Sequence, residues 1–460
     1  MKRRNKLWLM AGVLTLTLVL TLGIALVDQH MEKIRSSGET ILSIPADSVT
    51  ALSWDYEGQT LSFTRDDSWH YAGDPDFPVS ALDMENILDP LGNLTAAFRI
   101  EDVEDYDQYG FADPVCTVAI TAGDQSFTLR LGAYSKMDQQ RYADIGDGNV
   151  YLLHHDPMEE FGQGLSDVIE NDDIPYLDSA DTITFTGAQT YTILREPEGA
   201  VSHRPEDRYF AKIEGQLLPL STPSVENFLS SLTMLDLTGF QTYTASREGL
   251  DAWGLDQPDL TIRVDYTREE TDGSFTLMLA REESEEDPEN APVYAHLEGS
   301  ELVYAITPAE YDSLTACGYD DLRHAEIFPA PLDQVQALEI RLDGGVYEIA
   351  AGEEEDAPFL YLEQEVDLSP VITALGSLHA GEFTREPADG PLEIRLTADL
   401  KTGEQVTLEL YRKDGTHCTA LVDGQVVALI PRAQAVELME QIRTIVLTPP
   451  QPAEAPEENP

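Results

Sequence analysis

Basic residues are scarce in this 460-residue chain. It contains 28 lysines and arginines against 85 aspartates and glutamates, which gives a formal net charge of −57. A nucleic-acid-binding surface needs lysine and arginine to displace the counterions of the phosphates. The composition therefore excludes nucleic acid as a partner. It leaves cations or a basic partner open, although an acidic surface also serves solubility.

Cysteine is scarce as well. The three cysteines, Cys116, Cys317 and Cys418, are far apart in the sequence, and none belongs to a C-x-x-C pair. Such spacing excludes a cysteine-rich zinc site and a dense disulfide framework. Cys116 lies in an alternating, strand-like segment, so we expect it to be a small core residue.

The common catalytic and cofactor-binding motifs are missing. The chain has no G-x-S-x-G, H-E-x-x-H, S-x-x-K, Walker A or G-x-G-x-x-G sequence. With 85 acidic residues, any pair of carboxylates could be proposed for glycoside hydrolysis, so no pair is singled out. We predict that the chain is not an enzyme and has no catalytic residue and no cofactor.

Two segments resemble metal-ligand clusters, and for each a structural interpretation is preferred. The first is His154-His155-Asp156; adjacent residues of a strand face opposite sides, so the two histidines are poorly placed to share an ion. The second, residues 144–149, has calcium-type oxygens but lacks the spacing and the closing glutamate of an EF-hand. A hairpin turn between Tyr142 and Tyr151 explains it better. We therefore predict no metal site.

Two acid-rich runs, at residues 282–287 and 353–356, fall between predicted strands. Dense like charges extend a loop and are usually solvated. We interpret both runs as hairpin insertions, with weak calcium binding as the alternative.

Long hydrophobic segments are absent except at the start of the chain. Residues 7–27 are apolar or small throughout, which is enough to cross a bilayer as a helix. Four basic residues precede this segment: Lys2, Arg3, Arg4 and Lys6. The charge bias predicts a single-pass anchor in the cell membrane, with a cytoplasmic stub at 1–6, a juxtamembrane linker at 28–39 and the rest of the chain extracytoplasmic. The alternative is a cleaved signal peptide, whose apolar region is usually shorter.

The rest of the chain is organised in repeats. Three apolar stripes with i, i+3, i+4, i+7 spacing predict one amphipathic helix in each repeat. These stripes are Met84, Ile87, Leu88 and Leu91; Val225, Phe228, Leu229 and Leu232; and Val371, Ala374, Leu375 and Leu378. Pro90 should kink or end the first helix. Strands with period-2 alternation precede and follow each helix, so we predict repeat units at 40–176, 177–330 and 331–447, the last of them degenerate.

A short turn motif occurs twice, each time directly before an alternating apolar segment. It reads aromatic, glycine, large apolar residue, two spacers and proline. The two copies are Tyr109, Gly110, Phe111 and Pro114, and Trp253, Gly254, Leu255 and Pro258. Glycine permits positive φ, and proline can begin a strand without losing a ladder donor. We interpret the motif as a structural turn, with a ligand-contacting turn as the alternative.

Together these patterns predict an α+β protein. An N-terminal transmembrane helix would be followed by about three tandem units, each a mainly antiparallel sheet with a packed amphipathic helix. The tail at 448–460 is rich in proline and glutamate and is expected to be disordered.

The anchor, the β-rich units and the aromatic-glycine-apolar-x-x-proline turn together resemble a bacterial family of membrane-anchored, repeat-built envelope proteins, a domain-of-unknown-function family. The third unit has only Asp389-Gly390-Pro391 at the turn, without the aromatic residue. Genes of this family often lie beside genes of gliding-motility-type ABC transporters. The resemblance therefore implies a non-catalytic accessory subunit, and it supplies no catalytic residue.

Three functions follow from the sequence. The first is a membrane-tethered extracytoplasmic accessory or scaffolding protein that binds an ABC transporter subunit or another envelope protein. The second is an extracytoplasmic module that binds a glycan or calcium. The third, an envelope hydrolase, requires acidic residues that converge in one pocket with perturbed pKa values.

Overall fold

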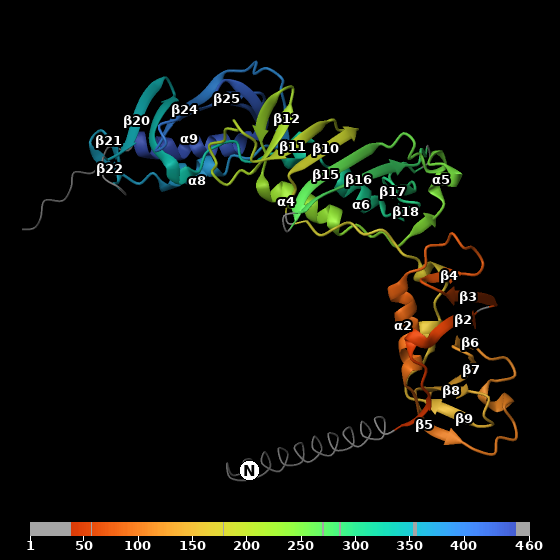
Figure 1. The fold of residues 1–460 in the computed structure, drawn as a ribbon. Helices are drawn as coiled ribbons and strands as arrows, with labels where there is room; N and C mark the ends of the chain where they lie inside the picture. The colour runs from red at the N-terminus through yellow and green to blue at the C-terminus, as the bar shows by residue number, and fades with distance from the viewer. Residues whose placement is uncertain are drawn as a thin grey trace, which may run out of the picture. The chain divides into compact units, whose positions relative to one another are not determined.

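The computed structural model describes residues 38–56, 58–177, 179–268, 271–284, 287–352 and 357–447. These residues form three nine-stranded sheets, in which neighbouring strands pair antiparallel (Figure 1). They divide into two compact units. Unit 1 holds the described residues up to Asp172 together with Phe240–Thr244, and unit 2 holds the others.

The first sheet has the strand order β1-β5-β9-β8-β7-β6-β2-β3-β4. Its strands are β1 (Glu39–Leu42), β2 (Val49–Tyr56), β3 (Gln59–Arg65), β4 (Trp69–Tyr71), β5 (Leu94–Ile100), β6 (Cys116–Ala122), β7 (Gln125–Ser135), β8 (Gln140–Asp144) and β9 (Val150–Leu153). Alternation along β2 and β3 buries Trp54 and Phe63, whose rings stack at 5.2 Å between centroids. This aromatic pair anchors the core of unit 1.

The second sheet has the order β13-β12-β11-β10-β15-β16-β17-β18-β14. Its strands are β10 (Thr182–Gly187), β11 (Tyr191–Arg195), β12 (Tyr209–Ile213), β13 (Gln216–Pro219), β14 (Phe240–Thr242), β15 (Leu260–Arg268), β16 (Thr271–Arg281), β17 (Val293–Leu297) and β18 (Val303–Ile306).

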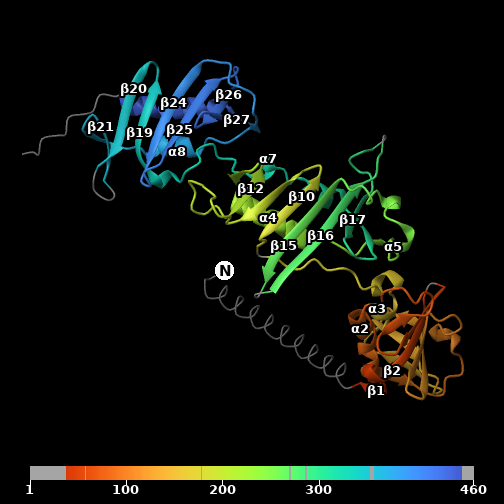
Figure 2. The ribbon, with the colours of Figure 1, turned by 45° about the horizontal axis from the view of Figure 1, so that its top comes forward.

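The third sheet has the order β22-β21-β20-β19-β24-β25-β26-β27-β23. Its strands are β19 (Val335–Leu342), β20 (Gly345–Ala351), β21 (Phe359–Tyr361), β22 (Gln364–Val366), β23 (Glu382–Phe383), β24 (Leu392–Leu400), β25 (Gln405–Arg412), β26 (His417–Val422) and β27 (Gln425–Pro431). Figure 2 shows β19, β20, β24, β25, β26 and β27 of this sheet side by side.

The three sheets share one pairing rule. In each, an opening strand (β2, β10 or β19) pairs on one side with its hairpin partner and on the other side with a strand much later in the sequence (β6, β15 or β24). The later strand begins two residues after the proline of the turn motif in the first two sheets. The strand that follows the turn, β6 or β15, therefore lies in the interior of its sheet.

Helices cover the sheets in short pieces. They are α2 (Ala81–Gly92), α3 (Met158–Phe161), α4 (Thr222–Thr233), α5 (Ala245–Glu248), α6 (Pro308–Thr315), α7 (Tyr319–Leu322), α8 (Ser369–Gly376) and α9 (Arg432–Leu447). All residues of the three predicted apolar stripes are buried. In the third sheet, Leu375 of α8 and Leu438 of α9 belong to one core with strand residues such as Leu396 and Leu408.

Pro90 does not end the first helix, because α2 continues through it to Gly92, and a kink at Pro90 stays a prediction. Proline has no backbone N–H, so α2 lacks the hydrogen bond that residue 90 would donate to the carbonyl four residues earlier.

The start of α2 depends on Ser80. Its Oγ accepts a hydrogen bond from the Asp83 backbone N–H at 3.3 Å, and Ser80 is 5% exposed. Ser80→Ala should lower the free energy of unfolding by about 1 kcal/mol, because one buried helix donor loses its acceptor. Ser80→Asp keeps an acceptor and is the control. Urea denaturation measures both, and equal stability of the alanine variant and the wild type would contradict the assignment.

The predicted α+β class is wrong. The strands of the three sheets hold more of the described residues than the helices do, and the longest of the described helices, α9, has 16 residues. The apolar stripes mark the helices correctly, but they reveal nothing about how many strands each helix accompanies. Since strands paired across long loops make up the sheets, the fold is mainly β.

The N-terminal transmembrane helix of that prediction falls outside the residues that the structure describes. Among the described residues, no helix has the length and apolar character needed to cross a membrane. The segment at 7–27, the stub at 1–6, most of the linker at 28–39 and the tail at 448–460 lie outside the described residues.

Candidate functional site

Both copies of the turn motif adopt the same backbone. Tyr109 ends a 3-10 turn at Asp107–Tyr109, and Gly110 follows with a φ of 86°. Trp253 ends a 3-10 turn at Asp251–Trp253, and Gly254 follows with a φ of 68°. Both glycines occupy the left-handed region, where a Cβ is strained.

The apolar residue of each copy is buried, at 5% exposure for Phe111 and 1% for Leu255. Pro114 lies two positions before β6, and Pro258 lies two before β15. The first turn thus sets the start of β6 in unit 1, and the second turn sets the start of β15 in unit 2. In the third copy, Gly390 keeps a negative φ, and a Cβ there would collide with the Arg412 carbonyl.

Sequence reasoning missed the partner of the first turn. A Cβ at Gly132 of β7 would collide with the Tyr109 carbonyl oxygen, and a Cβ at Gly110 would lie 2.7 Å from the Ala133 backbone nitrogen. The turn and β7 therefore touch backbone to backbone. Glycine inside an otherwise alternating strand is a known sign of such an approach.

An aromatic row lies beside this turn, on one face of the first sheet. We define it as Phe98, Tyr142 and Tyr109, with Leu152 between the first two. Phe98 and Tyr142 are both register partners of Leu152, and the rings of Tyr142 and Tyr109 lie 5.0 Å apart. Phe98 is 63% exposed, and both tyrosines are partly exposed. Such a row offers stacking and apolar contact to a protein side chain or a sugar ring.

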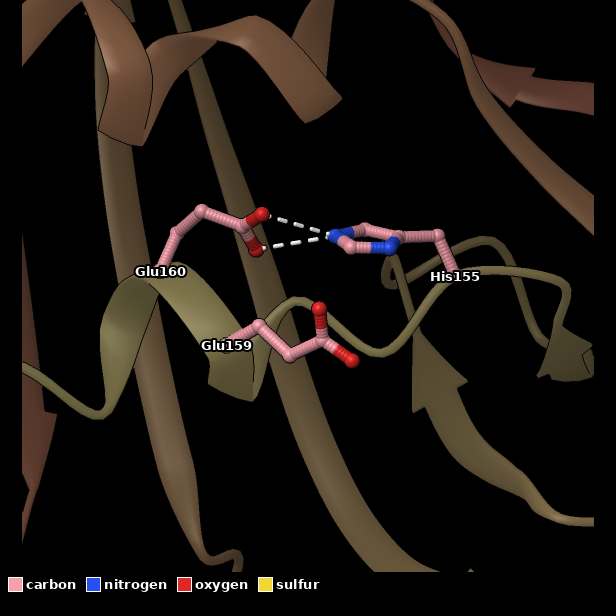
Figure 3. A group of neighbouring side chains, drawn as sticks. All are labelled: His155, Glu159 and Glu160. Atoms are coloured by element: carbon pink, nitrogen blue, oxygen red, sulfur yellow. Dashed lines mark hydrogen bonds and ion pairs between the residues drawn. The ribbon is translucent and has the colours of Figure 1, made fainter. Parts of the chain in front are cut away.

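The histidine segment does not form the cluster written in its sequence. The carboxylate of Asp156 instead accepts a hydrogen bond from Arg141 Nε at 2.6 Å. Figure 3 shows instead that His155 faces Glu160 of α3, with Glu159 alongside. The His155 Nε2 lies 2.8 and 2.9 Å from the two Glu160 oxygens.

One donor atom from each of these three residues lies within 4.8 Å of the others. One imidazole and two carboxylates form a donor set that zinc accepts. The spacing His-x-x-x-Glu-Glu could have indicated this, but only with knowledge that α3 turns back toward the loop before it. In the structure the histidine–glutamate contact is itself a charge-assisted hydrogen bond.

The calcium-type segment at 144–149 is the hairpin turn between β8 and β9. Asp144 accepts from Arg130 and from the Gly146 backbone N–H. Asp147 accepts from Asn149 and from the Tyr151 hydroxyl at 2.5 Å. Burial disfavours the Asp147 carboxylate, but these hydrogen bonds outweigh burial and lower its pKa. The carboxylates therefore close the turn. Of the acid-rich runs, 353–356 and positions 285 and 286 lie outside the described residues.

The three cysteines are buried and unpaired with one another. Burial raises the pKa of Cys116 and Cys317 to about 12; burial and the carboxylate of Glu393 do the same for Cys418. A nucleophilic cysteine needs a lowered pKa, so these thiols have the character of core residues.

Unit 2 contains a cavity of about 170 Å³. It is lined by the loop between β11 and β12, by α7 and the segment after it, and by the ends of β13, β23, β26 and β27. Most of its walls are apolar, and its polar residues include two arginines and two histidines: Arg204, Arg323, His203 and His324. The sequence did not indicate this cavity, because its walls come from segments more than 100 residues apart.

Serine, histidine and aspartate meet at this cavity in an order that does not fit a catalytic triad. Asp207, with a side chain 1% exposed, accepts from Ser202 Oγ at 2.6 Å and contacts His324 Nε2 at 2.7 Å. A triad needs histidine between serine and the carboxylate to take the serine proton. Here the carboxylate lies between them, so Ser202 has no base.

Part of the chain matches a known protein family. Residues 69–210 match DUF4340. The family is described as a domain of unknown function. The DUF4340 match begins in β4, contains the aromatic row and the first turn, and ends in β12, so it crosses the predicted boundary at 176/177. No curated protein matches the chain.

Proposed function

We propose that this chain is a membrane-tethered, extracytoplasmic accessory or scaffolding protein that binds another envelope component, with ABC transporter subunits among the candidates. The apolar segment at 7–27 and the basic residues before it support the tether. The resemblance described above supports the kind of partner.

The observation that carries the proposal is the aromatic row of unit 1. Exposed apolar residues that lie together on a surface mark sites of interaction, and Phe98, at 63% exposure, lies in one row with two partly exposed tyrosines. Aromatic residues dominate the binding energy of protein interfaces. The row lies in the region that matches DUF4340, so it belongs to the part of the chain that is shared with other proteins.

The second candidate is a glycan-binding module, for which the same row is the favourable observation. The rings of Tyr109 and Tyr142 lie close together and are partly exposed, an arrangement that a sugar ring can stack against. Calcium binding is less favoured, since the oxygens of Asp144 and Asp147 are already engaged within the turn.

Capture of crosslinked partners tests the proposal. Native membranes are crosslinked, the chain is recovered through a C-terminal tag, and partners are identified by mass spectrometry for the wild type and Phe98→Ser. We expect the serine variant to recover roughly thirtyfold less of the main partner, the effect of losing an interface hot spot. Leu82→Ser is the matched control, because Leu82 of α2 is 67% exposed but lies outside the row.

Equal recovery of the partner by Phe98→Ser and the wild type would show that the aromatic row is not part of the interface. Recovery of this chain alone, with efficient crosslinking of other complexes, would contradict the accessory function. If purified chain then binds glycan and Phe98→Ser does not, the second candidate replaces the first.

A further inference from the structure

The cavity of unit 2 has the size and walls of a small-molecule site. Its apolar wall residues include Val201, Pro219, Ile327, Val422 and Val427. Its volume of about 170 Å³ is close to that of a dry cavity of about 150 Å³ known to hold benzene. One aromatic ring or a short aliphatic chain therefore fits.

Arg204 brings an unused donor to this cavity. Its side chain is 16% exposed, and its Nε is buried without an acceptor among the described residues. One terminal nitrogen donates to the Phe328 carbonyl at 3.0 Å, and the other is 4.0 Å from Glu206. A buried N–H without an acceptor costs free energy, so the chain itself does not fully satisfy the guanidinium of Arg204.

Arg323 adds a second cation that is held in place. Its guanidinium lies 4.9 Å from the ring centroid of Tyr319 and 4.3 Å from that of Phe383. Stacking between the rings fixes the plane of the guanidinium. Its one carboxylate contact, with Asp320, is long at 3.4 Å.

The carboxylates of the cavity are less free to bind a ligand. Both oxygens of Asp207 are engaged, one by Ser202 and the other by His324. Glu326 lies 3.8 Å from His324 and 3.9 Å from His379, and His203 contacts Glu404 at 3.0 Å. Both distances from Glu326 exceed that of a hydrogen bond, so this carboxylate keeps acceptor capacity. The wall nevertheless holds two arginines against this one carboxylate that accepts no hydrogen bond among the described residues, which favours an anion over a cation.

We propose that this cavity binds a small monocarboxylate with an apolar body, such as a single-ring aromatic acid or a short-chain aliphatic acid. The body packs against the valine, proline and isoleucine walls, and the guanidinium groups of Arg204 and Arg323 hold the carboxylate. One charge is enough: the chain carries −57 overall, so a multiply charged anion is repelled more strongly on approach.

Calorimetric titration of the full chain in detergent tests this site. The probes are benzoate and hexanoate, with benzyl alcohol as the neutral and benzylamine as the cationic counterpart of benzoate. We expect benzoate to bind at least about tenfold more tightly than benzyl alcohol, and benzylamine not to bind. Arg204→Gln should weaken benzoate at least about tenfold and leave benzyl alcohol unchanged.

Arg195→Gln is the matched control. Arg195 also has a buried Nε without an acceptor among the described residues, but it does not line the cavity, so its variant should bind benzoate like the wild type. Val427→Phe fills the cavity and should abolish binding while the circular dichroism spectrum stays unchanged. If Arg204→Gln does not fold, this second variant decides.

Three results would overturn the proposal. Equal binding of benzoate and benzyl alcohol would leave a purely apolar cavity. Preferential binding of benzylamine would show that the site selects cations rather than carboxylates. No heat with any probe at millimolar concentration would exclude a small-molecule site. None of them bears on the aromatic row of unit 1.

Discussion

Gly110→Ala is expected to lower the free energy of unfolding of unit 1 by about 3 kcal/mol. Two costs add at this position. The φ of 86° strains any residue with a Cβ, by roughly 1–2 kcal/mol. The new Cβ would also lie 2.7 Å from the Ala133 backbone nitrogen, and a backbone atom cannot rotate away. Differential scanning calorimetry measures the loss.

Gly254→Ala is the matched variant in the second copy of the turn. Its φ of 68° carries the same strain, but the nearest atom to a Cβ there is Ala280 Cβ at 3.6 Å, an ordinary contact. We expect a loss of about 1 kcal/mol. Equal losses at Gly110 and Gly254 would contradict the close approach of the first turn to β7. Unchanged stability at Gly110 with lost partner binding would make the turn a contact site.

Glu393→Gln is expected to lower the free energy of unfolding by about 2 kcal/mol at neutral pH. The Glu393 side chain in β24 is 5% exposed and accepts from Arg412 at the end of β25 and from Arg432 at the start of α9. Its charge therefore ties α9 to the third sheet. Glutamine keeps the shape and removes the charge.

This effect should depend on pH in a defined direction. Burial disfavours the Glu393 carboxylate, but the hydrogen bonds from Arg432 and Arg412 outweigh burial and lower its pKa below the ordinary value of 4.5. A carboxyl whose pKa is lower in the folded state stabilises fully above its unfolded pKa, and this stabilisation is lost as pH falls through the folded pKa. The difference between wild type and Glu393→Gln should be constant above about pH 5 and shrink below 4.5.

Urea denaturation at a series of pH values measures this difference. Glu386→Gln is the control, because the Glu386 side chain is 74% exposed and solvent screens its contact with Lys413, so its loss should leave the stability nearly unchanged. Parallel pH profiles for the wild type and Glu393→Gln would show that Glu393 is not the group that titrates.

Local patterns predicted the helices and the turns well. The stripe through Met84 and Leu91 has the spacing of a helix face, and glycine before a large apolar residue is typical of a left-handed turn. Both signals lie within a few residues of sequence. They do not determine which strands become neighbours, such as β5 with β9 or β2 with β6, and the fold class depends on those pairings.

The candidate sites show the same limit. The aromatic row joins residues from β5, β8 and the first turn, and no spacing in the sequence connects Phe98 with Tyr142 and Tyr109. The cavity joins Arg204 with Arg323 and Phe383, which no spacing rule connects. Metal reasoning chose Asp156 because it is adjacent to His155, whereas the helical turn of α3 brings Glu159 and Glu160 to that histidine.

The most direct test of the accessory function is a photo-crosslinking amino acid placed at Phe98 of the chain in native membranes. The account predicts that light produces a covalent adduct with another envelope protein at position 98 and none with the same amino acid at Leu82. No adduct at position 98, or equal adducts at both positions, would contradict the central claim that the aromatic row is the surface through which this chain binds its partner.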